Sequence, residues 1–117
     1  MTIAEWIMSI KALCDASVAA GKTLQRISEA TLTQRERELL RAASEDGSFQ
    51  LVCNELDGKH VYAGGREFTN TEDVAETARY LDSFTRLCDR GLVEHQVDEI
   101  FRLTGQGFDI ARKLAKN

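Results

Sequence analysis

The chain has 117 residues, of which 43% are hydrophobic and 29% charged, and its formal net charge at pH 7 is -4. This length allows one globular domain with an appendage and excludes two substantial hydrophobic cores. The chain contains no proline and only eight glycines, which excludes a proline-rich linker and favours long helices. The acidic charge weakens a nucleic-acid-binding function without excluding it, because the local distribution of basic side chains decides that question.

The cysteines and the N-terminal residues indicate in which cellular compartment the protein is expected. Cys14, Cys53 and Cys88 are an odd number without a C-x-x-C pair, so a disulfide framework is not expected. Glu5 and Lys11 break the charge and hydropathy pattern of a signal peptide. No stretch approaches the roughly 20 apolar residues that are needed to span a bilayer. We therefore expect a cytoplasmic protein that does not associate with a membrane.

The first 30 residues have the pattern of a long amphipathic helix. Thr2 and Glu5 form a capping box, which predicts a helix start. An apolar stripe with alternating steps of three and four follows, the spacing of a coiled-coil seam. It consists of Ile3, Trp6, Ile10, Leu13, Ser17, Ala20, Leu24 and Ile27. We predict that residues 1–30 form a self-association segment, with a homodimer held by Ile3, Trp6, Ile10, Leu13, Leu24 and Ile27. The alternative is that the same stripe packs on its own domain.

A short helix and a hairpin are predicted next. Thr33 and Glu36 form a second capping box, and the helix that they start is expected to stop at Gly47. Its inward positions are Leu39, Leu40 and Ala43. Two alternating stretches then flank a turn at Asp57-Gly58, which predicts a β-hairpin that ends at Gly64-Gly65. The paired glycines are expected to supply positive φ angles.

The last third of the chain is predicted to contain a long helix, a second hairpin and a terminal helix. Cap candidates for the long helix are Thr69, Asn70 and Thr71. Gly91 is expected to end it, and Thr104 to cap the terminal helix. The inward stripe of the long helix is Val74, Ala78, Leu81, Phe84, Leu87 and Cys88. The second hairpin is predicted from residues 92–95 and 99–103 around a turn at 96–98.

This part of the chain resembles the C-terminal half of bacterial winged-helix domains. It reads Leu81-x-x-Phe84-x-x-Leu87-x-x-x-Gly91-Leu92-Val93-Glu94, then Phe101-x-Leu103-Thr104-x-x-Gly107-x-x-x-Ala111. The resemblance implies that the long helix is the recognition helix, that the hairpin is the wing and that the last helix closes the core. It also implies a fold class: α+β, mainly helical, with a winged-helix domain at 31–117 behind a long N-terminal helix. The chain departs from the family between residues 49 and 71, where a β-hairpin replaces the usual second helix.

The face of the long helix opposite its inward stripe is arginine-rich. It carries Glu76, Arg79, Ser83, Arg86 and Arg90 at steps of three and four. Guanidinium groups suit phosphates and guanine edges. We therefore predict a DNA contact surface made of Arg66, Arg79, Ser83, Arg86, Arg90, His95 and Gln96. The alternative is that Arg79, Arg86 and Arg90 pair with Glu76, Asp82 and Asp89 on a solvated helix face.

Metal binding and catalysis are not predicted. Cys53 and His60 share the six-residue gap of Cys88 and His95, but structural zinc sites more often use close ligand pairs. No phosphate loop, G-x-S-x-G or H-E-x-x-H motif is present, so no enzyme and no cofactor are expected.

Two functions follow from these observations. The first is a small dimeric winged-helix DNA-binding protein that regulates transcription, with the N-terminal helix setting the spacing between two units. The alternative is a protein-interaction module of a larger bacterial system, which docks a protein partner through its acidic surface and central hairpin and does not bind DNA.

Overall fold

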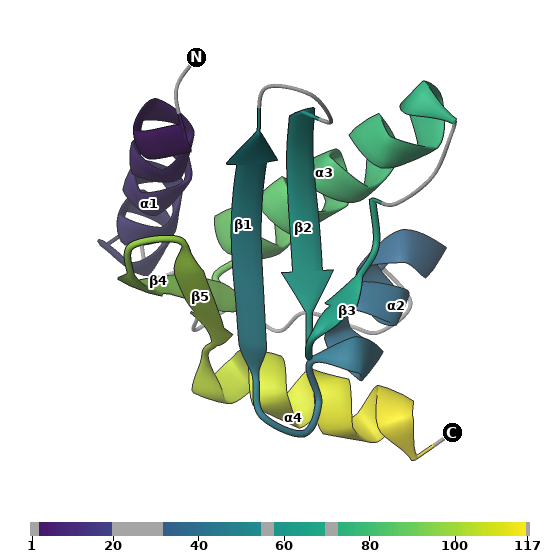
Figure 1. The fold of residues 1–117 in the computed structure, drawn as a ribbon. Coiled ribbons are helices and arrows are strands. Elements are labelled where there is room, and N and C mark those ends of the chain that lie inside the picture. The colour runs from purple at the N-terminus through teal and green to yellow at the C-terminus, as the bar shows by residue number, and fades with distance from the viewer. Residues whose placement is uncertain (1–2, 20–31, 55–57, 70–72, 117) are drawn as a thin grey trace.

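The computed structural model describes residues 3–19, 32–54, 58–69 and 73–116. Over these residues the chain is an α+β fold with four helices and one five-stranded antiparallel sheet, as Figure 1 shows. The α+β prediction is therefore confirmed. In chain order the elements are α1 (Ile3–Ala19), α2 (Gln34–Ala42), β1 (Ser48–Asn54), β2 (Gly58–Ala63), β3 (Arg66–Glu67), α3 (Val74–Asp89), β4 (Val93–Val97), β5 (Ile100–Leu103) and α4 (Gly105–Ala115).

Both predicted hairpins are present, and they are parts of a single sheet with the strand order β3-β2-β1-β5-β4. β1 pairs with β2 on one side and with β5 on the other, so Phe49 lies between Ala63 and Phe101. Local sequence signals predicted each hairpin, but the pairing of β1 with β5 joins segments about fifty residues apart. The two hairpins therefore share one hydrophobic face.

Gly64 and Gly65 form a two-residue turn between β2 and the short strand β3, which the sequence did not predict. Their φ angles are 59° and 84°, which confirms the expected positive values. A two-residue hairpin turn of this kind favours glycine, since residues with a Cβ rarely adopt such angles. At Gly64 an added Cβ would also lie only 1.9 Å from the carbonyl oxygen of Ala42. The turn therefore brings the sheet edge against the end of α2.

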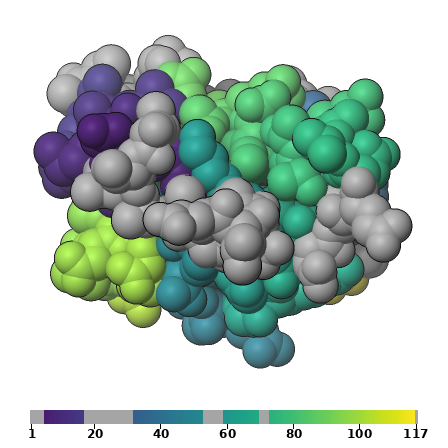
Figure 2. Space-filling model, turned by 45° about the horizontal axis from the view of Figure 1, so that its top comes forward, coloured from purple at the N-terminus to yellow at the C-terminus, as the bar shows by residue number. Residues whose placement is uncertain are grey.

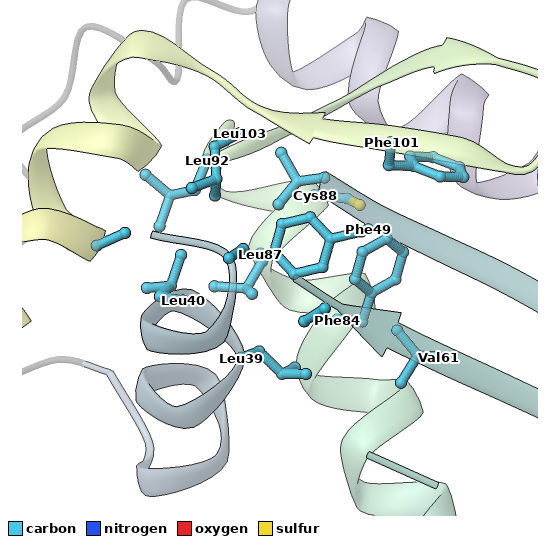
Figure 3. Close-up of a cluster of buried hydrophobic side chains, with 14 of the residues drawn as sticks. Leu39, Leu40, Phe49, Val61, Phe84, Leu87, Cys88, Leu92, Phe101 and Leu103 are labelled. Atoms are coloured by element: carbon cyan, nitrogen blue, oxygen red, sulfur yellow. The ribbon is translucent and has the colours of Figure 1, made fainter. Parts of the chain in front are cut away.

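The core lies between the sheet and the helices packed on one of its faces, as Figures 1 and 3 show. The ring of Phe84, from α3, lies 5.3 Å from that of Phe49 and 5.4 Å from that of Phe101. The predicted inward stripe of this helix is correct for Phe84, Leu87 and Cys88, which are fully buried. It is wrong at the start, where Val74 is 82% exposed and Ala78 is exposed too, because the first turns of α3 extend beyond the sheet (Figure 1).

The capping predictions have mixed outcomes. The capping box at the start of α2 is confirmed: Thr33 Oγ1 accepts from the Glu36 N-H at 3.2 Å. The cap candidates for α3 were wrong, because Asp73 caps the helix by accepting from the N-H groups of Ala75 and Glu76. Thr69 instead accepts a hydrogen bond from the backbone of β2. Asn70 and Thr71 lie outside the described residues.

The passage from α3 through the second hairpin to α4 follows the predicted local signals. Gly91 ends α3 with a φ of 75°, and Thr104 caps α4 by accepting from the Gly107 N-H at 3.1 Å. Gly107 packs directly on the chain that leaves α3, since an added Cβ would lie 2.2 Å from the carbonyl oxygen of Leu92. This close approach positions α4 across the end of the sheet (Figure 1).

α1 packs on α3 and β4, on the side of the molecule where Figure 2 shows it beside the β4–β5 hairpin. Trp6 and Ile10 are 7% and 4% exposed and belong to the same core as the rest of the chain. These two side chains therefore follow the alternative prediction, in which the apolar stripe packs on its own domain. Leu13 is half-buried against this core, while Leu24, Ile27 and the side chain of Ile3 lie outside the described part.

A homodimer held by Trp6 and Ile10 would therefore need α1 to leave the core. Self-association through this helix stays a prediction. The described helices include none that combines the length and the apolar character needed to cross a bilayer.

Candidate nucleic-acid interface

An open hollow of about 240 Å³ lies between the N-terminus of α2 and the outer face of α3. We call it the arginine hollow, and it is lined by Thr33, Arg35, Arg79, Asp82, Ser83 and Arg86. Three of these residues, Arg79, Ser83 and Arg86, belong to the predicted DNA contact surface. Thr33 and Arg35 come from the start of α2, where the helix dipole contributes a partial positive charge.

Arg35 is held in place by a bidentate ion pair with Glu76 of α3. The Nε and Nη2 atoms of Arg35 lie 2.7 and 2.8 Å from the two carboxylate oxygens of Glu76. These hydrogen bonds lower the pKa of Glu76 and raise the pKa of Arg35. The Arg35 guanidinium also lies 5.9 Å from the centre of the Tyr80 ring. The pair connects α2 to α3 and orients a guanidinium group at the edge of the hollow.

The two arginines of the hollow that come from α3 differ in their partners. Arg79 Nη1 lies 3.6 Å from Glu76 Oε2 and its side chain is 58% exposed, so the predicted alternative of a surface pair applies to this residue. Arg86 is exposed and has no carboxylate partner among the described residues. Three guanidinium groups face two carboxylates, those of Glu76 and Asp82, which leaves one net positive charge. This charge is opposite in sign to that of the whole chain.

Arg90 and Ser83 are engaged in contacts within the protein. Arg90 Nε lies 3.7 Å from Glu36 Oε2, and the Glu36 side chain is fully buried. A buried carboxylate needs such a positive partner, so Arg90 has a structural role at the junction of α2 and α3. Ser83 is only 2% exposed and its hydroxyl donates to the backbone carbonyl of Arg79 at 2.8 Å. It forms part of the wall of the hollow rather than a projecting contact.

Arg66 lies away from the arginine hollow, on strand β3. Its guanidinium stacks over the Phe68 ring at 4.7 Å, and the Phe68 ring in turn lies 5.5 Å from that of Tyr80. Tyr80 donates a short hydrogen bond to Glu38 of α2. Burial is the main reason why the pKa of Tyr80 is raised to about 12, and the contact with Glu38 adds to it. This aromatic cluster joins the sheet edge to both helices.

His95 and Gln96 lie on β4, in the hairpin that the resemblance identifies as the wing. His95 Nε2 is 2.8 Å from the backbone oxygen of Asp98, and the ring packs edge-on against Phe101. Gln96 is exposed near the turn. The same hairpin carries the carboxylates of Glu94, Asp98 and Glu99. A phosphate backbone would meet repulsion here, so the predicted surface does not extend favourably to the wing.

The histidines of the two equally spaced Cys–His pairs lie in separate surroundings, and the side chain of Cys53 lies outside the described part of the structure. His60 Nδ1 lies 2.8 Å from Glu67 Oε1 and 3.3 Å from Thr69 Oγ1, whereas His95 faces the backbone of its own hairpin. Cys88 is buried in the core beside Cys14. Within the described ranges no three metal-ligating side chains gather into one group.

Thr33 and Arg35 were not predicted as part of the interface. The sequence identified Thr33 only as a helix cap, and Arg35 stands in the first turn after it without any motif. Arg35 and Glu76 are 41 positions apart, so no local spacing connects them. The usable signal was the helix start itself, since a capped N-terminus with a basic first-turn residue is a common place for anions.

Comparison with known proteins finds no matching family model, no matching curated protein and no matching solved structure. The winged-helix family therefore stays a prediction that depends on the residues between 80 and 114. The observed order of elements after residue 73 is a long helix, a two-stranded hairpin and a closing helix, which is the order that the resemblance implies.

Proposed function

We propose that the protein binds DNA by placing the arginine hollow against the phosphate backbone, with Arg79 and Arg86 as its main contacts. The observation that carries this proposal is the clustering of three guanidinium groups around one open hollow, in a chain whose overall charge is acidic. Arginine presents a planar fork of donors that fits a phosphate group in a bidentate manner. Arg86 has this fork available because no described carboxylate occupies it.

The surroundings of the hollow support a phosphate ligand. Thr33 caps the N-terminus of a nine-residue helix, and backbone N-H groups there favour negative charge. Arg35 is already oriented by Glu76, which reduces the side-chain entropy lost on binding. The acidic wing repels DNA and so limits the contact to α3 and the start of α2. We therefore expect weak, strongly salt-dependent binding rather than a broad base-reading interface.

The test is fluorescence anisotropy with a mixed-sequence duplex at low and moderate salt. We expect the wild type to bind at low salt, and the double variant Arg79→Ala, Arg86→Ala to bind more weakly with a salt slope smaller by about two. The matched control is Arg112→Ala with Lys113→Ala, which removes the same charge from the exposed side of α4. It should keep the salt slope of the wild type. Equal losses in both variants would show that only net charge matters and would reject the hollow as the site.

The uncovered sheet face favours a second function, docking of a protein partner. In the described part no helix covers the face that carries Gln50, Tyr62 and Ile100, which lie side by side across three strands. Val97, next in this row, is 54% exposed. This row combines Tyr62, Ile100 and Val97 with the polar Gln50, and its position beside the acidic wing suits a basic protein segment. Absence of DNA binding at low salt would favour this function. A monomeric solution mass at micromolar concentration would reject self-association through α1.

A further inference from the structure

Cys14 and Cys88 meet where α1 packs on α3. Their side chains are 1% and 0% exposed and belong to the same core. The two thiols lie close enough to interact, since each side chain shifts the pKa of the other. Figure 3 shows the Cys88 side chain within this core, with its sulfur at the edge of the aromatic cluster. Two free, buried thiols that lie beside each other in one core, on two helices that pack together, are placed to form a covalent bond between those helices.

We propose that Cys14 and Cys88 are an oxidation site, at which a small disulfide such as oxidised glutathione converts the pair into an intramolecular disulfide that fastens α1 to α3. The product is reversible, because an excess of a small thiol returns both cysteines to the reduced state. The proposal is independent of DNA binding, since neither cysteine lines the arginine hollow.

The reaction proceeds in two balanced exchange steps. The Cys14 thiolate attacks one sulfur of the small disulfide, the S–S bond breaks, and the first small thiol leaves with the proton that Cys14 lost. The Cys88 thiolate then attacks the Cys14 sulfur of the mixed disulfide and releases the second small thiol. The cysteine pair is oxidised by two electrons and the small disulfide is reduced to two thiols.

The environment assigns the first step to Cys14. Cys14 lies on α1, so the movement that admits the reagent exposes its thiol, whereas Cys88 stays on α3 in the core, where burial raises its pKa well above its usual value. The thiolate is the nucleophile in disulfide exchange, so the thiol with the lower pKa reacts first. Cys88 becomes reactive once the mixed disulfide on Cys14 has formed, because that disulfide is then held next to the Cys88 thiol at a high effective concentration.

The reagent reaches the pair only when α1 moves away from the core. α1 is peripheral, since Met8 on its far side is 64% exposed and its packing is confined to one face. A helix that is packed through one face only can detach locally without global unfolding. The disulfide would then suppress this opening and close a long loop in the unfolded chain, which stabilises the native state.

The experiment uses the full chain with Cys53→Ser, so that only Cys14 and Cys88 can react. After treatment with oxidised glutathione, the thiols are counted in denaturant and the intact mass is measured. We expect both thiols to disappear together, with the loss of two hydrogen atoms and no added glutathione. Tm should rise by roughly 5–15 °C in the oxidised form and return to its starting value after reduction.

Single variants in the same background provide the controls. With Cys88→Ser, Cys14 should accumulate a glutathione adduct, and with Cys14→Ser, Cys88 should react much more slowly. Peptide mapping of the oxidised wild type identifies the bonded pair without relying on any variant to fold. Stable glutathione adducts on both cysteines, disulfide-linked dimers, a bond that involves Cys53, or an intramolecular bond that lowers Tm would each overturn the proposal.

Discussion

On its inner face α3 presents Phe84, Leu87 and Cys88, which are fully buried, whereas on its outer face Arg79 and Arg86 are exposed to solvent. The inner side chains lie among groups from both hairpins and from α1. The outer arginines contact few groups and carry the charge of the hollow. One helix therefore contributes to stability through one face and to the proposed binding through the other. Substitutions on the inner face should therefore lower stability, whereas substitutions on the outer face should weaken DNA binding and leave stability nearly unchanged.

The largest effect is expected on the inner face, from Phe84→Ala. The ring lies between those of Phe49 and Phe101, so its removal leaves a cavity that the sheet cannot close. The free energy of unfolding should fall by about 3–5 kcal/mol, a large part of the total for a domain of this size. Urea denaturation measures this loss. A loss below about 1 kcal/mol would contradict the packing of α3 on the sheet.

A smaller loss of stability is expected at the start of α2, which lies next to α3. Thr33→Ala removes the side-chain hydrogen bond to the Glu36 N-H and should cost about 1 kcal/mol of stability. Thr33→Ser keeps the cap and should lose only a small part of this energy. Thermal unfolding of the three proteins measures the difference. If serine and alanine cost the same, the methyl group of Thr33 and not its hydrogen bond is what stabilises the helix.

Tyr80 lies between the inner and outer faces of α3 and makes the stability of the fold depend on pH. Its pKa is about 12 in the folded chain, above the ordinary value near 10 in the unfolded chain. Below pH 10 both states hold the proton and the contribution is complete. As pH rises towards 12, the unfolded state loses the proton first, so the contribution is progressively lost. Unfolding followed between pH 9 and 12 should show a steeper decline for the wild type than for Tyr80→Phe, and equal slopes would contradict the shift.

The smallest stability effect is expected on the outer face, from Arg86→Ala. This side chain is exposed and has no described carboxylate partner, so the free energy of unfolding should change by less than about 0.5 kcal/mol. DNA binding at low salt should nevertheless weaken. Measuring the free energy of unfolding and the DNA affinity of this variant tests whether the outer face serves binding and not stability. A stability loss comparable to that of Phe84→Ala would show that the outer face is part of the packed structure.

Arg90 shows why the outer face was only partly predictable. Its position at the end of α3 places it on the arginine face, in line with Arg79 and Arg86. Glu36, from a different helix, draws it inward as the partner of a buried carboxylate. Ser83 has the correct helical position as well, yet it is buried where α2 approaches. Helical spacing gives the direction of a side chain but not the neighbour that covers it.

The sequence by itself determined the features that depend on neighbours a few positions away. Local capping bonds fix the helix starts at Thr33 and Thr104. Local backbone angles fix the glycine turn at 64–65 and the end of α3 at Gly91. The cysteines were different: their odd number and the lack of a C-x-x-C pair predicted no disulfide framework, and no local spacing connects Cys14 to Cys88.

Only the tertiary structure decided the long-range contacts. The pairing of β1 with β5, the bond of Arg35 to Glu76 and the meeting of Cys14 with Cys88 join segments that are distant in the chain. Such contacts depend on which apolar faces are buried together, because burial of the shared core repays the entropy of closing long loops. The arginine hollow and the cysteine pair both arise in this way, since each is assembled from two helices that the core brings together.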